Sequence, residues 1–174
     1  MEPEVAHEVF RGSIFTVLRE RWPGFDHEHD VLRHPGAAAV LPITPSGQVL
    51  LVRQFRPAIR QTLIEIPAGL LDVDGEDALT CASRELFEET GHRHESFEFL
   101  GGVFTSAGFT DEYVHLFVAG VAEAPEAEPE PGLELLKMPF DELVTSARGG
   151  RVRDVKTALA LLLADARGGV RPVG

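Results

Sequence analysis

The sequence predicts an α+β fold built on a mixed β-sheet. Short apolar segments with strand character recur along the 174-residue chain, and three other segments have helical composition. These strands and helices do not alternate regularly, as they would in a protein with an all-parallel sheet. The length and the 44% hydrophobic content suit one globular domain rather than a disordered chain.

The N-terminal segment is predicted to form strands. Val9–Trp22 alternates loosely between apolar and polar residues, and Phe25–His34 reads as its hairpin partner. Pro35 and Gly36 then interrupt the chain, as is typical of the end of a strand.

The next segment is expected to begin the core sheet. Ala37–Ile43 is a short apolar run, typical of a buried strand. The turn residues Thr44–Gly47 lead into a second strand, Gln48–Phe55, so we expect residues 37–55 to form a hairpin. Leu63–Ile66 is another short strand, stopped by Pro67.

Glu76–Thr90 is predicted to be a helix, because it is rich in Ala, Leu and Glu and Gly91 stands where a helix should stop. Leu79, Ala82 and Leu86 share one face, which we expect to pack on the sheet. The remaining expected elements are strands at Phe97–Phe104 and Tyr113–Ala122, a Pro/Glu loop at Ala124–Gly132, a strand at Leu133–Met138, a helix at Pro139–Ala147 and a helix at Asp154–Ala166 with Asp154 as its N-cap.

The charge balance excludes some classes of partner. Lys and Arg number 16 against 28 Asp and Glu, a net charge of −12, which argues against nucleic acid as a partner. No apolar run reaches the roughly 20 residues that span a bilayer, and the acidic segment Met1–Phe10 does not resemble a signal peptide. The single cysteine, Cys81, fits a reducing compartment such as the cytoplasm and is interpreted as a packing residue of its helix.

Three glutamates of the predicted helix form an acidic stripe. Glu85, Glu88 and Glu89 are three and four residues apart, so their carboxylates project from one side of the helix. Hard oxygen ligands in this arrangement suit Mg²⁺ or Mn²⁺. Arg84 can pair with Glu88 at the i,i+4 spacing and hold its carboxylate in place. By itself, such a stripe is also compatible with a solvated acidic surface.

The surrounding pattern resembles the Nudix box, Gly-x5-Glu-x7-Arg-Glu-U-x-Glu-Glu-x-Gly-U, in which U is a bulky apolar residue. The part that fits with its spacing intact is Glu76-x7-Arg84-Glu85-Leu86-x-Glu88-Glu89-x-Gly91. Average composition would give the five fixed residues of the last eight positions at roughly 10⁻⁶ per window.

The chain departs from the box in two places. Gly69 lies one residue too far from Glu76, so the loop between them carries an extra residue. The final apolar position holds His92. Neither departure removes a candidate metal ligand. His92 and His94, like His27 and His29, lack the i,i+4 spacing of helical metal ligands. All four are interpreted as surface residues.

The resemblance implies a Nudix fold, a mixed sheet between helices, whose substrate is a nucleoside diphosphate linked to another group. It also implies metal ligands at Glu85 and Glu89, with Glu88 and the backbone oxygen of Ala68 as further ligands. Bound Mg²⁺ or Mn²⁺ neutralises the diphosphate and lowers the pKa of a bound water. A diphosphate does not otherwise approach so acidic a protein closely.

Over roughly residues 8–166 the sequence resembles the ADP-ribose pyrophosphatase branch of this family. The segments that carry it are Phe10–Val17, His34–Ala37, Val52–Arg56, Glu65–Gly69, Gly108–Glu112 and Asp154–Thr157. In that branch the N-terminal strands help to build a homodimer, so residues 1–35 are interpreted as a dimerisation element and 36–174 as the catalytic core of one domain. Ala107 replaces a proline that is usual in the branch, which leaves GDP-mannose open as the substrate.

The resemblance also suggests substrate-binding residues. Arg56 and Arg53 end a strand, and an arginine fork matches phosphate oxygens. Glu65, Glu112 and the turn at Gly108 are further candidates. For each of these residues a surface or loop role is the alternative.

The catalytic base and the nucleobase site are less narrowly defined by the sequence. By resemblance, the base is a glutamate of the Pro/Glu loop, with Glu130 slightly favoured over Glu128. Phe15 and Trp22 are candidates for stacking on an adenine from the neighbouring subunit, or else for packing.

We therefore expect metal-dependent hydrolysis of ADP-ribose to AMP and ribose 5-phosphate. Hydrolysis of another nucleoside diphosphate sugar is the first alternative. A domain that binds ADP-ribose without cleaving it is the second, although a binding protein has no need for a full set of metal carboxylates.

Overall fold

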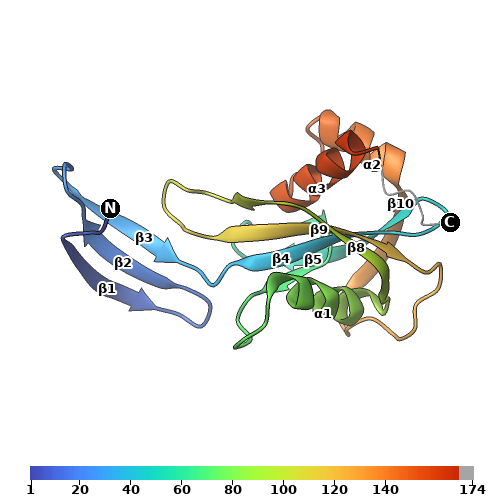
Figure 1. The fold of residues 1–174 in the computed structure, drawn as a ribbon, viewed down its shortest axis with the longest axis horizontal. Coiled ribbons are helices and arrows are strands. Elements are labelled where there is room, and N and C mark those ends of the chain that lie inside the picture. The colour runs from blue at the N-terminus through green and yellow to red at the C-terminus, as the bar shows by residue number, and fades with distance from the viewer. Residues whose placement is uncertain (169–174) are drawn as a thin grey trace.

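The computed structural model describes residues 1–168, which form two sheets and three helices (Figure 1). The strands are β1 (Val5–Arg11), β2 (Thr16–Arg21), β3 (Glu28–Arg33), β4 (Ala37–Ile43), β5 (Gln48–Arg56), β6 (Gln61–Glu65), β7 (Ala68–Leu70), β8 (His94–Phe104), β9 (Tyr113–Val121) and β10 (Glu134–Pro139). The helices are α1 (Ala78–Thr90), α2 (Phe140–Arg148) and α3 (Val155–Ala166). None of these helices within residues 1–168 is long and apolar enough to cross a membrane.

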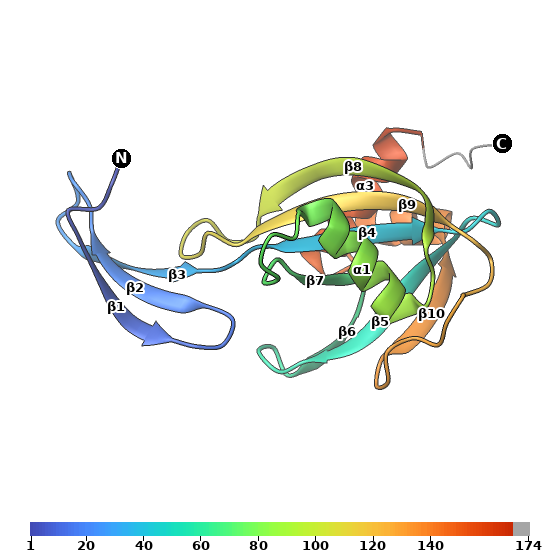
Figure 2. The ribbon, with the colours of Figure 1, turned by 60° about the horizontal axis from the view of Figure 1, so that its bottom comes forward.

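The central sheet is mixed, as predicted. Its seven strands run in the order β10-β5-β4-β9-β8, with β6 paired to β5 and β7 paired to β4. The β4–β9 pair is parallel and the other pairs are antiparallel. Helix α1 lies on one face of the sheet and α2 and α3 lie on the other (Figures 1 and 2).

Each face of the central sheet has its own core. On the α1 side, Ala82 and Leu86 pack with Val40 and Phe117 from the sheet. On the other side, residues of α2 and α3 pack against alternate residues of the same strands. All seven residues of β4 are buried because both of its faces are covered, which explains its continuous apolar sequence.

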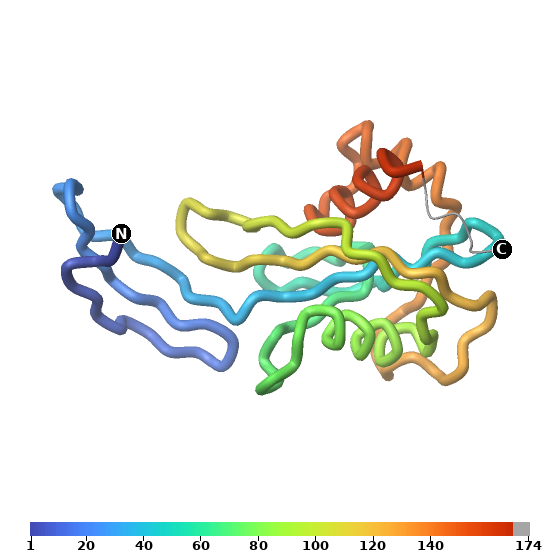
Figure 3. The backbone as a smooth tube through the Cα atoms, viewed as in Figure 1, coloured from blue at the N-terminus to red at the C-terminus, as the bar shows by residue number. Residues whose placement is uncertain are grey.

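The N-terminal strands form a separate three-stranded sheet in the order β1-β2-β3, beyond one end of the central sheet (Figure 2). Strand β3 leads directly into β4, and the loop between β8 and β9 reaches the N-terminal sheet (Figure 3). Leu32 N donates to Phe109 O at 2.7 Å and Asp111 N donates to Leu32 O at 3.2 Å, which joins that loop to β3.

Two sequence predictions about the strands are wrong in part. Val9–Trp22 is not one strand, because Gly12 N donates to Phe15 O at 2.9 Å and the chain turns between β1 and β2. Residues 37–55 are a hairpin only beside their turn, where Ile43 pairs with Val49. Beyond that point β4 and β5 diverge, and β4 pairs instead with β7 and β9.

Helix α1 has the predicted ends to within two residues. The Asp77 carboxylate caps the helix by accepting from Thr80 N, and Gly91 ends it in the left-handed conformation at φ 70°. Leu79 is exposed, so the expectation that it packs on the sheet is wrong, whereas Ala82 and Leu86 are buried. The predicted N-cap of α3, Asp154, is confirmed, since its carboxylate accepts from Thr157 N.

Candidate active site

The box-like segment forms strand β7, a loop and helix α1, and it places two glutamates against the backbone of β7. A Cβ atom at Gly69 would lie 1.9 Å from Glu85 Oε1, so only glycine allows this carboxylate its position. The Glu89 carboxylate accepts from Ala68 N at 3.2 Å. The extra residue of the box falls in the loop between β7 and α1, away from these contacts.

Burial raises the pKa of both carboxylates. Glu89 is 7% exposed, and burial, with the nearby charge of Glu85, raises the pKa of Glu89 to about 7. Burial also raises the pKa of Glu85 above its usual value. Two partly desolvated carboxylates side by side form an unfavourable pair that a bound cation would stabilise.

Arg84 holds the surrounding carboxylates together. It forms the predicted contact with Glu88, at 3.0 Å, and also donates to Glu85 at 2.5 Å. Its Nε and Nη2 donate two hydrogen bonds to the Glu76 carboxylate, at 2.9 and 3.0 Å, and these bonds lower the pKa of Glu76. Glu76 has no predicted role of its own, although its fixed spacing in the box is the sequence signal that identifies it.

The acidic residues supply the oxygen donors that a hard divalent cation prefers, but their side chains are not gathered around one binding point. Among residues 1–168, no three His, Cys, Asp or Glu side chains converge on one point. Glu88 is half exposed, and Arg84 occupies one oxygen each of Glu85 and Glu88. The oxygen donors lie beside the glycine backbone of β7, where Gly69 leaves the space that a side chain would fill.

A cavity of about 410 Å³ adjoins this segment. Five residues singled out from the sequence line it: Arg56, Glu65, Ala68, Gly69 and Glu112. Three other lining residues, Thr105, Asp154 and Lys156, had no predicted role in the site. The fold thus brings β5, β6, β7, the β8–β9 loop and the start of α3 to one place.

Glu65 organises one wall of this cavity. It is 1% exposed, and its two oxygens accept from Arg56 Nε at 2.8 Å and Arg56 Nη2 at 2.6 Å. Lys156 Nζ also contacts Glu65 and donates to Asp154 at 3.0 Å. Burial raises the pKa of Glu65, but the hydrogen bonds from Arg56 and the charge of Lys156 lower it by more, so the net shift is downward.

Glu112 lines the same cavity from the β8–β9 loop. It accepts from Thr105 Oγ1 at 2.5 Å, and its other oxygen lies 3.7 Å from His34 Nε2. The tip of this loop, which includes Gly108, faces a second cavity instead.

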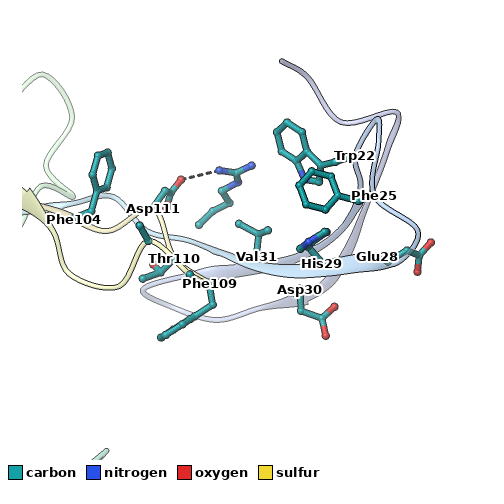
Figure 4. A pocket seen from close by; sticks show the side chains of 13 residues that line it. Trp22, Phe25, Glu28, His29, Asp30, Val31, Phe104, Phe109, Thr110 and Asp111 are labelled. Carbon is teal, nitrogen blue, oxygen red and sulfur yellow. Dashed lines mark hydrogen bonds and ion pairs between the residues drawn. The ribbon is translucent and has the colours of Figure 1, made fainter.

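The second cavity is larger, about 700 Å³, and lies between the N-terminal sheet and the β8–β9 loop (Figure 4). Trp22 and Phe25 line it from the sheet, and Phe104 and Phe109 line it from the central-sheet side. Phe15 is not among its lining residues; its ring packs near Phe10, with centroids 6.0 Å apart. Of these two cavities, the smaller one is lined by Ala68, one of the candidate metal ligands.

Arg33 joins the two sides of the larger cavity. It donates to the buried Glu20 at 2.7 Å and to Asp111 at 3.1 Å, the ion pair dashed in Figure 4. Glu20 also accepts from Trp22 Nε1 at 3.0 Å. The structure therefore fixes Trp22 through a buried carboxylate, a feature that the sequence pattern did not reveal.

Arg53 is not brought to the cavity with Arg56. It lies on the part of β5 that pairs with β10, where it donates to Glu134 at 3.1 Å. Both of these side chains are largely exposed.

The Pro/Glu loop is anchored to the C-terminal end of α1. Glu130 N donates to Glu88 O at 2.8 Å, and Glu126 N donates to Gly91 O, also at 2.8 Å. The side chains of Glu128 and Glu130 are exposed. These contacts hold the loop against the helical turn that carries the acidic stripe.

His92 and Cys81 complete the environment of α1. His92 is buried, so its interpretation as a surface residue is wrong; it occupies the apolar position of the box, and its Nδ1 lies 2.8 Å from Thr90 O. Cys81 is buried in the core beneath α1, as predicted, and burial raises the pKa of its thiol to about 12.

Comparison with known proteins identifies the family. The NUDIX domain model matches residues 32–159. An ADP-ribose pyrophosphatase of Bacillus subtilis is 36% identical over 168 residues, covering 92% of this chain and 90% of that protein. A GDP-mannose pyrophosphatase of Cronobacter sakazakii is also 36% identical, over 92% of this chain and 89% of its own length.

A solved structure described as an ADP compounds hydrolase has the same fold, with a TM-score of 0.74 at 20% identity, covering 98% of this chain and 96% of that one. The sheet, the box-like strand–loop–helix and these similarities lead to one conclusion: the chain belongs to the Nudix family.

Proposed function

We propose that this protein hydrolyses the diphosphate of ADP-ribose to AMP and ribose 5-phosphate with Mg²⁺ or Mn²⁺. The observation that carries the proposal is the pair of carboxylates of the partly buried Glu85 and the buried Glu89, set against the glycine backbone of β7 beside a cavity with cationic residues. The relationship to ADP-ribose pyrophosphatases over 92% of the chain supports ADP-ribose as the substrate.

Glu85, Glu89, the backbone oxygen of Ala68 and Glu88 are the residues that would hold the cation. When bound, it neutralises the diphosphate and lowers the pKa of a water molecule toward neutrality. Arg84 orients Glu85 and Glu88 through its hydrogen bonds. Burial raises the pKa of Glu89 to about 7, and a bound cation would favour the ionised form of this carboxylate.

The chain's other residues bind the substrate and accept a proton. Arg56, fixed by Glu65, donates to phosphate oxygens, and Glu112 faces the same cavity. Glu130 is the preferred base and Glu128 the second candidate, supported by the anchoring of their loop at Glu88.

The larger cavity suits the nucleobase. Its walls carry Trp22 and three phenylalanines, and aromatic rings stack on purines. Gly108 lies in the turn that closes this cavity.

A second candidate substrate is GDP-mannose. The Cronobacter sakazakii relative matches this chain as well as the Bacillus subtilis one does, and Ala107 stands where ADP-ribose pyrophosphatases usually have proline. The two substrates share the diphosphate, so the same acidic residues serve both.

A homodimer built through residues 1–35 is part of the proposal. Strand β1 and the turn after it expose Val5, Val9, Phe10 and Ile14, apolar side chains that a second subunit would bury. Sedimentation equilibrium of the full chain tests it: a mass of twice 19.0 kDa supports the dimer, and a monomer at micromolar concentration contradicts it. Residence in the cytoplasm is proposed from the lone buried thiol of Cys81.

Chromatography of ADP-ribose and GDP-mannose after incubation with the protein tests the activity. We expect AMP from ADP-ribose with Mg²⁺ or Mn²⁺ and none with EDTA. Glu89→Gln should lower kcat by roughly a hundredfold or more, because it removes a metal-binding charge. Glu95→Gln, an exposed glutamate outside the box, is the matched control.

The other outcomes separate the alternatives. GMP from GDP-mannose at a higher kcat/KM than AMP from ADP-ribose would favour the second substrate. Binding of ADP-ribose without product under every metal condition would identify a sensor. Full activity of Glu89→Gln would contradict the metal assignment.

A further inference from the structure

The end of β3 contacts the β8–β9 loop beside both cavities through neighbouring residues. Arg33, the last residue of β3, donates to Asp111, and both line the larger cavity (Figure 4). His34 follows in the chain, and its Nε2 lies 3.7 Å from Oε1 of Glu112, which lines the smaller cavity. Two consecutive residues therefore meet two consecutive residues of the loop, one pair at each cavity.

His34 is fixed through its backbone and through its ring. Its side chain is 10% exposed, and its backbone N donates to Asp111 Oδ1 at 2.8 Å. Gly36 N donates to His34 Nδ1 at 3.1 Å, so in the neutral ring Nδ1 is the acceptor and Nε2 carries the proton. The surrounding chain thus determines both the direction of the ring and the nitrogen that faces Glu112.

The orientation of Glu112 matters for an anionic substrate. Thr105 Oγ1 donates to one carboxylate oxygen at 2.5 Å, and the His34 ring faces the other, so each oxygen has its own neighbour. An ionised carboxylate accepts hydrogen bonds but repels phosphate oxygens. A Glu112 side chain free to rotate within the cavity would therefore weaken the binding of a diphosphate, whereas a fixed one can be kept clear of it.

The ring of His34 also has a possible structural role. Gly36 has φ 90°, and the Nδ1 atom of His34 serves its backbone N–H at the turn between β3 and β4. That role uses only one nitrogen of the ring. The distance of 3.7 Å from Nε2 to Glu112 is longer than a hydrogen bond, but contacts in ligand-free sites are often long and tighten when substrate binds.

We propose that His34 is a positioning residue, whose Nε2–H orients the Glu112 carboxylate in the smaller cavity. His34 acts through Glu112, since it is not itself among the residues that line this cavity. The effect on catalysis rests on the proposed function, whereas the interaction between the two side chains does not.

Two substitutions of His34 separate positioning from the structural role. His34→Asn places a carbonyl oxygen near the position of Nδ1, so it keeps an acceptor for Gly36 N but does not reach Glu112. His34→Gln extends an amide N–H to the approximate position of Nε2. With ADP-ribose and Mg²⁺, we expect His34→Asn to raise KM about fivefold with kcat within about twofold, the pattern of weakened substrate binding.

His34→Gln should restore KM to near the wild-type value. His94→Asn, which alters an exposed histidine of β8, is the matched control and should change neither constant. A wild-type KM in His34→Asn, or recovery by Asn and not by Gln, would show that only the contact with Gly36 matters and would overturn the proposal.

A double-mutant cycle asks whether the effect passes through Glu112. In the Glu112→Gln background, we expect His34→Asn to leave KM unchanged, because the carboxylate that His34 orients is already gone. If His34→Asn raises KM by the same factor with and without Glu112, the two residues act independently and the proposal fails.

The ring tautomer provides a readout that needs neither turnover nor a folded variant of His34. At about pH 8, where imidazole is neutral, two-bond ¹H–¹⁵N NMR spectra of the wild-type protein should show the Nε2–H form of His34. Glu112→Gln should shift the Nε2 resonance, and Glu95→Gln, at an exposed position, should not. An Nδ1–H form, or an Nε2 resonance that ignores Glu112→Gln, would contradict the proposed orientation.

The two proposals fail in different ways. A wild-type protein that cleaves neither ADP-ribose nor GDP-mannose contradicts the proposed function, while a His34 resonance that responds to Glu112→Gln would still support the orientation of Glu112 by His34. A wild-type protein that cleaves ADP-ribose with a KM independent of His34 contradicts the positioning role alone.

Discussion

The two sheets of this protein are stabilised in different ways. Every residue of β4 in the central sheet is buried, whereas every residue of β1 in the N-terminal sheet is exposed. Helices cover the central sheet on both faces, and among residues 1–168 no helix covers the N-terminal sheet (Figure 1). Burial of apolar surface therefore stabilises the first sheet, and the second must depend on other contacts.

The N-terminal sheet depends on polar contacts at its strands and at its edge. Arg19 pairs with Asp30 and Arg21 pairs with Glu28 across β2 and β3. Surface pairs of this kind contribute little stability, and a small uncovered sheet is marginal in water. Its attachment to the β8–β9 loop, and any second subunit, therefore decide how ordered it is.

Truncating a core side chain should have the largest effect. Leu41→Ala, in β4, removes a fully buried side chain and should lower the free energy of unfolding by about 3 kcal/mol. Val9→Ala, at 53% exposure in β1, should change it by less than about 0.5 kcal/mol in the monomer. Urea titration measures both. A large effect of Val9→Ala that depends on protein concentration would mean that a second subunit covers the sheet.

Anchoring of the Pro/Glu loop should be the next most sensitive feature. Gly91 has φ 70°, and an added Cβ would lie 1.9 Å from Ala127 O, so Gly91→Ala should destabilise the protein by about 2 kcal/mol. Gly75 has φ 77° with nothing within 4 Å of its Cβ position among residues 1–168, so Gly75→Ala isolates the backbone strain at about 1 kcal/mol. Equal unfolding free energies for the two variants would show that the loop does not pack against Gly91 in solution.

Arg33 is expected to control the attachment of the N-terminal sheet. Arg33→Gln leaves the buried Glu20 without its charged partner, which should cost about 1–2 kcal/mol because Arg33 is itself partly exposed. Hydrogen exchange should then accelerate in β3 and in the β8–β9 loop and stay unchanged in β4. Arg19→Gln breaks only the exposed pair with Asp30 and serves as the control. Unaltered exchange at β3 in Arg33→Gln would rule out this attachment.

The smallest expected effect concerns acid stability. The pKa of Glu65 lies below its usual 4.5 in the folded protein, so its stabilising contribution is complete above that pH and is lost as the pH falls through the lowered pKa. Between pH 5 and 3, the Tm of Glu65→Gln should therefore fall less steeply than that of the wild type. Glu28→Gln, in the exposed pair of the N-terminal sheet, should follow the wild-type slope. Parallel curves for all three proteins would contradict the role given to Glu65.

The sequence predicts best those elements whose signals are local. Helices α1 and α3 carry their own cap residues, and β4 is a continuous apolar run, so their positions agree with the structure to within two residues. The turn after β1 was missed because Gly12 stands in a loosely alternating stretch without Pro or Asn-Gly. Strand β7 was missed because its three residues become a strand only by pairing with β4.

In the candidate site, too, residues with a local sequence signal were predicted and residues defined by long-range contacts were not. The motif spacing identified Glu85, Glu88, Glu89 and Arg84, since all lie on one helix. The contacts of Glu65 with Lys156 join residues 91 positions apart, and no local pattern predicts which strand faces the start of α3. Buried partners such as Glu20 were missed because an isolated glutamate in a strand is indistinguishable from a surface residue.

The parallel pairing of β4 with β9 has a consequence for biosynthesis. Ala37 pairs with Val114 and Ile43 with Gly120, so the centre of the sheet joins residues from the two halves of the chain. Long-range parallel pairing forms slowly, because a large loop must close first. A nascent chain that has not yet emerged beyond Tyr113 presents β4, all apolar, with one edge unpaired. Until β9 leaves the ribosome, that apolar edge is open to pairing with other chains.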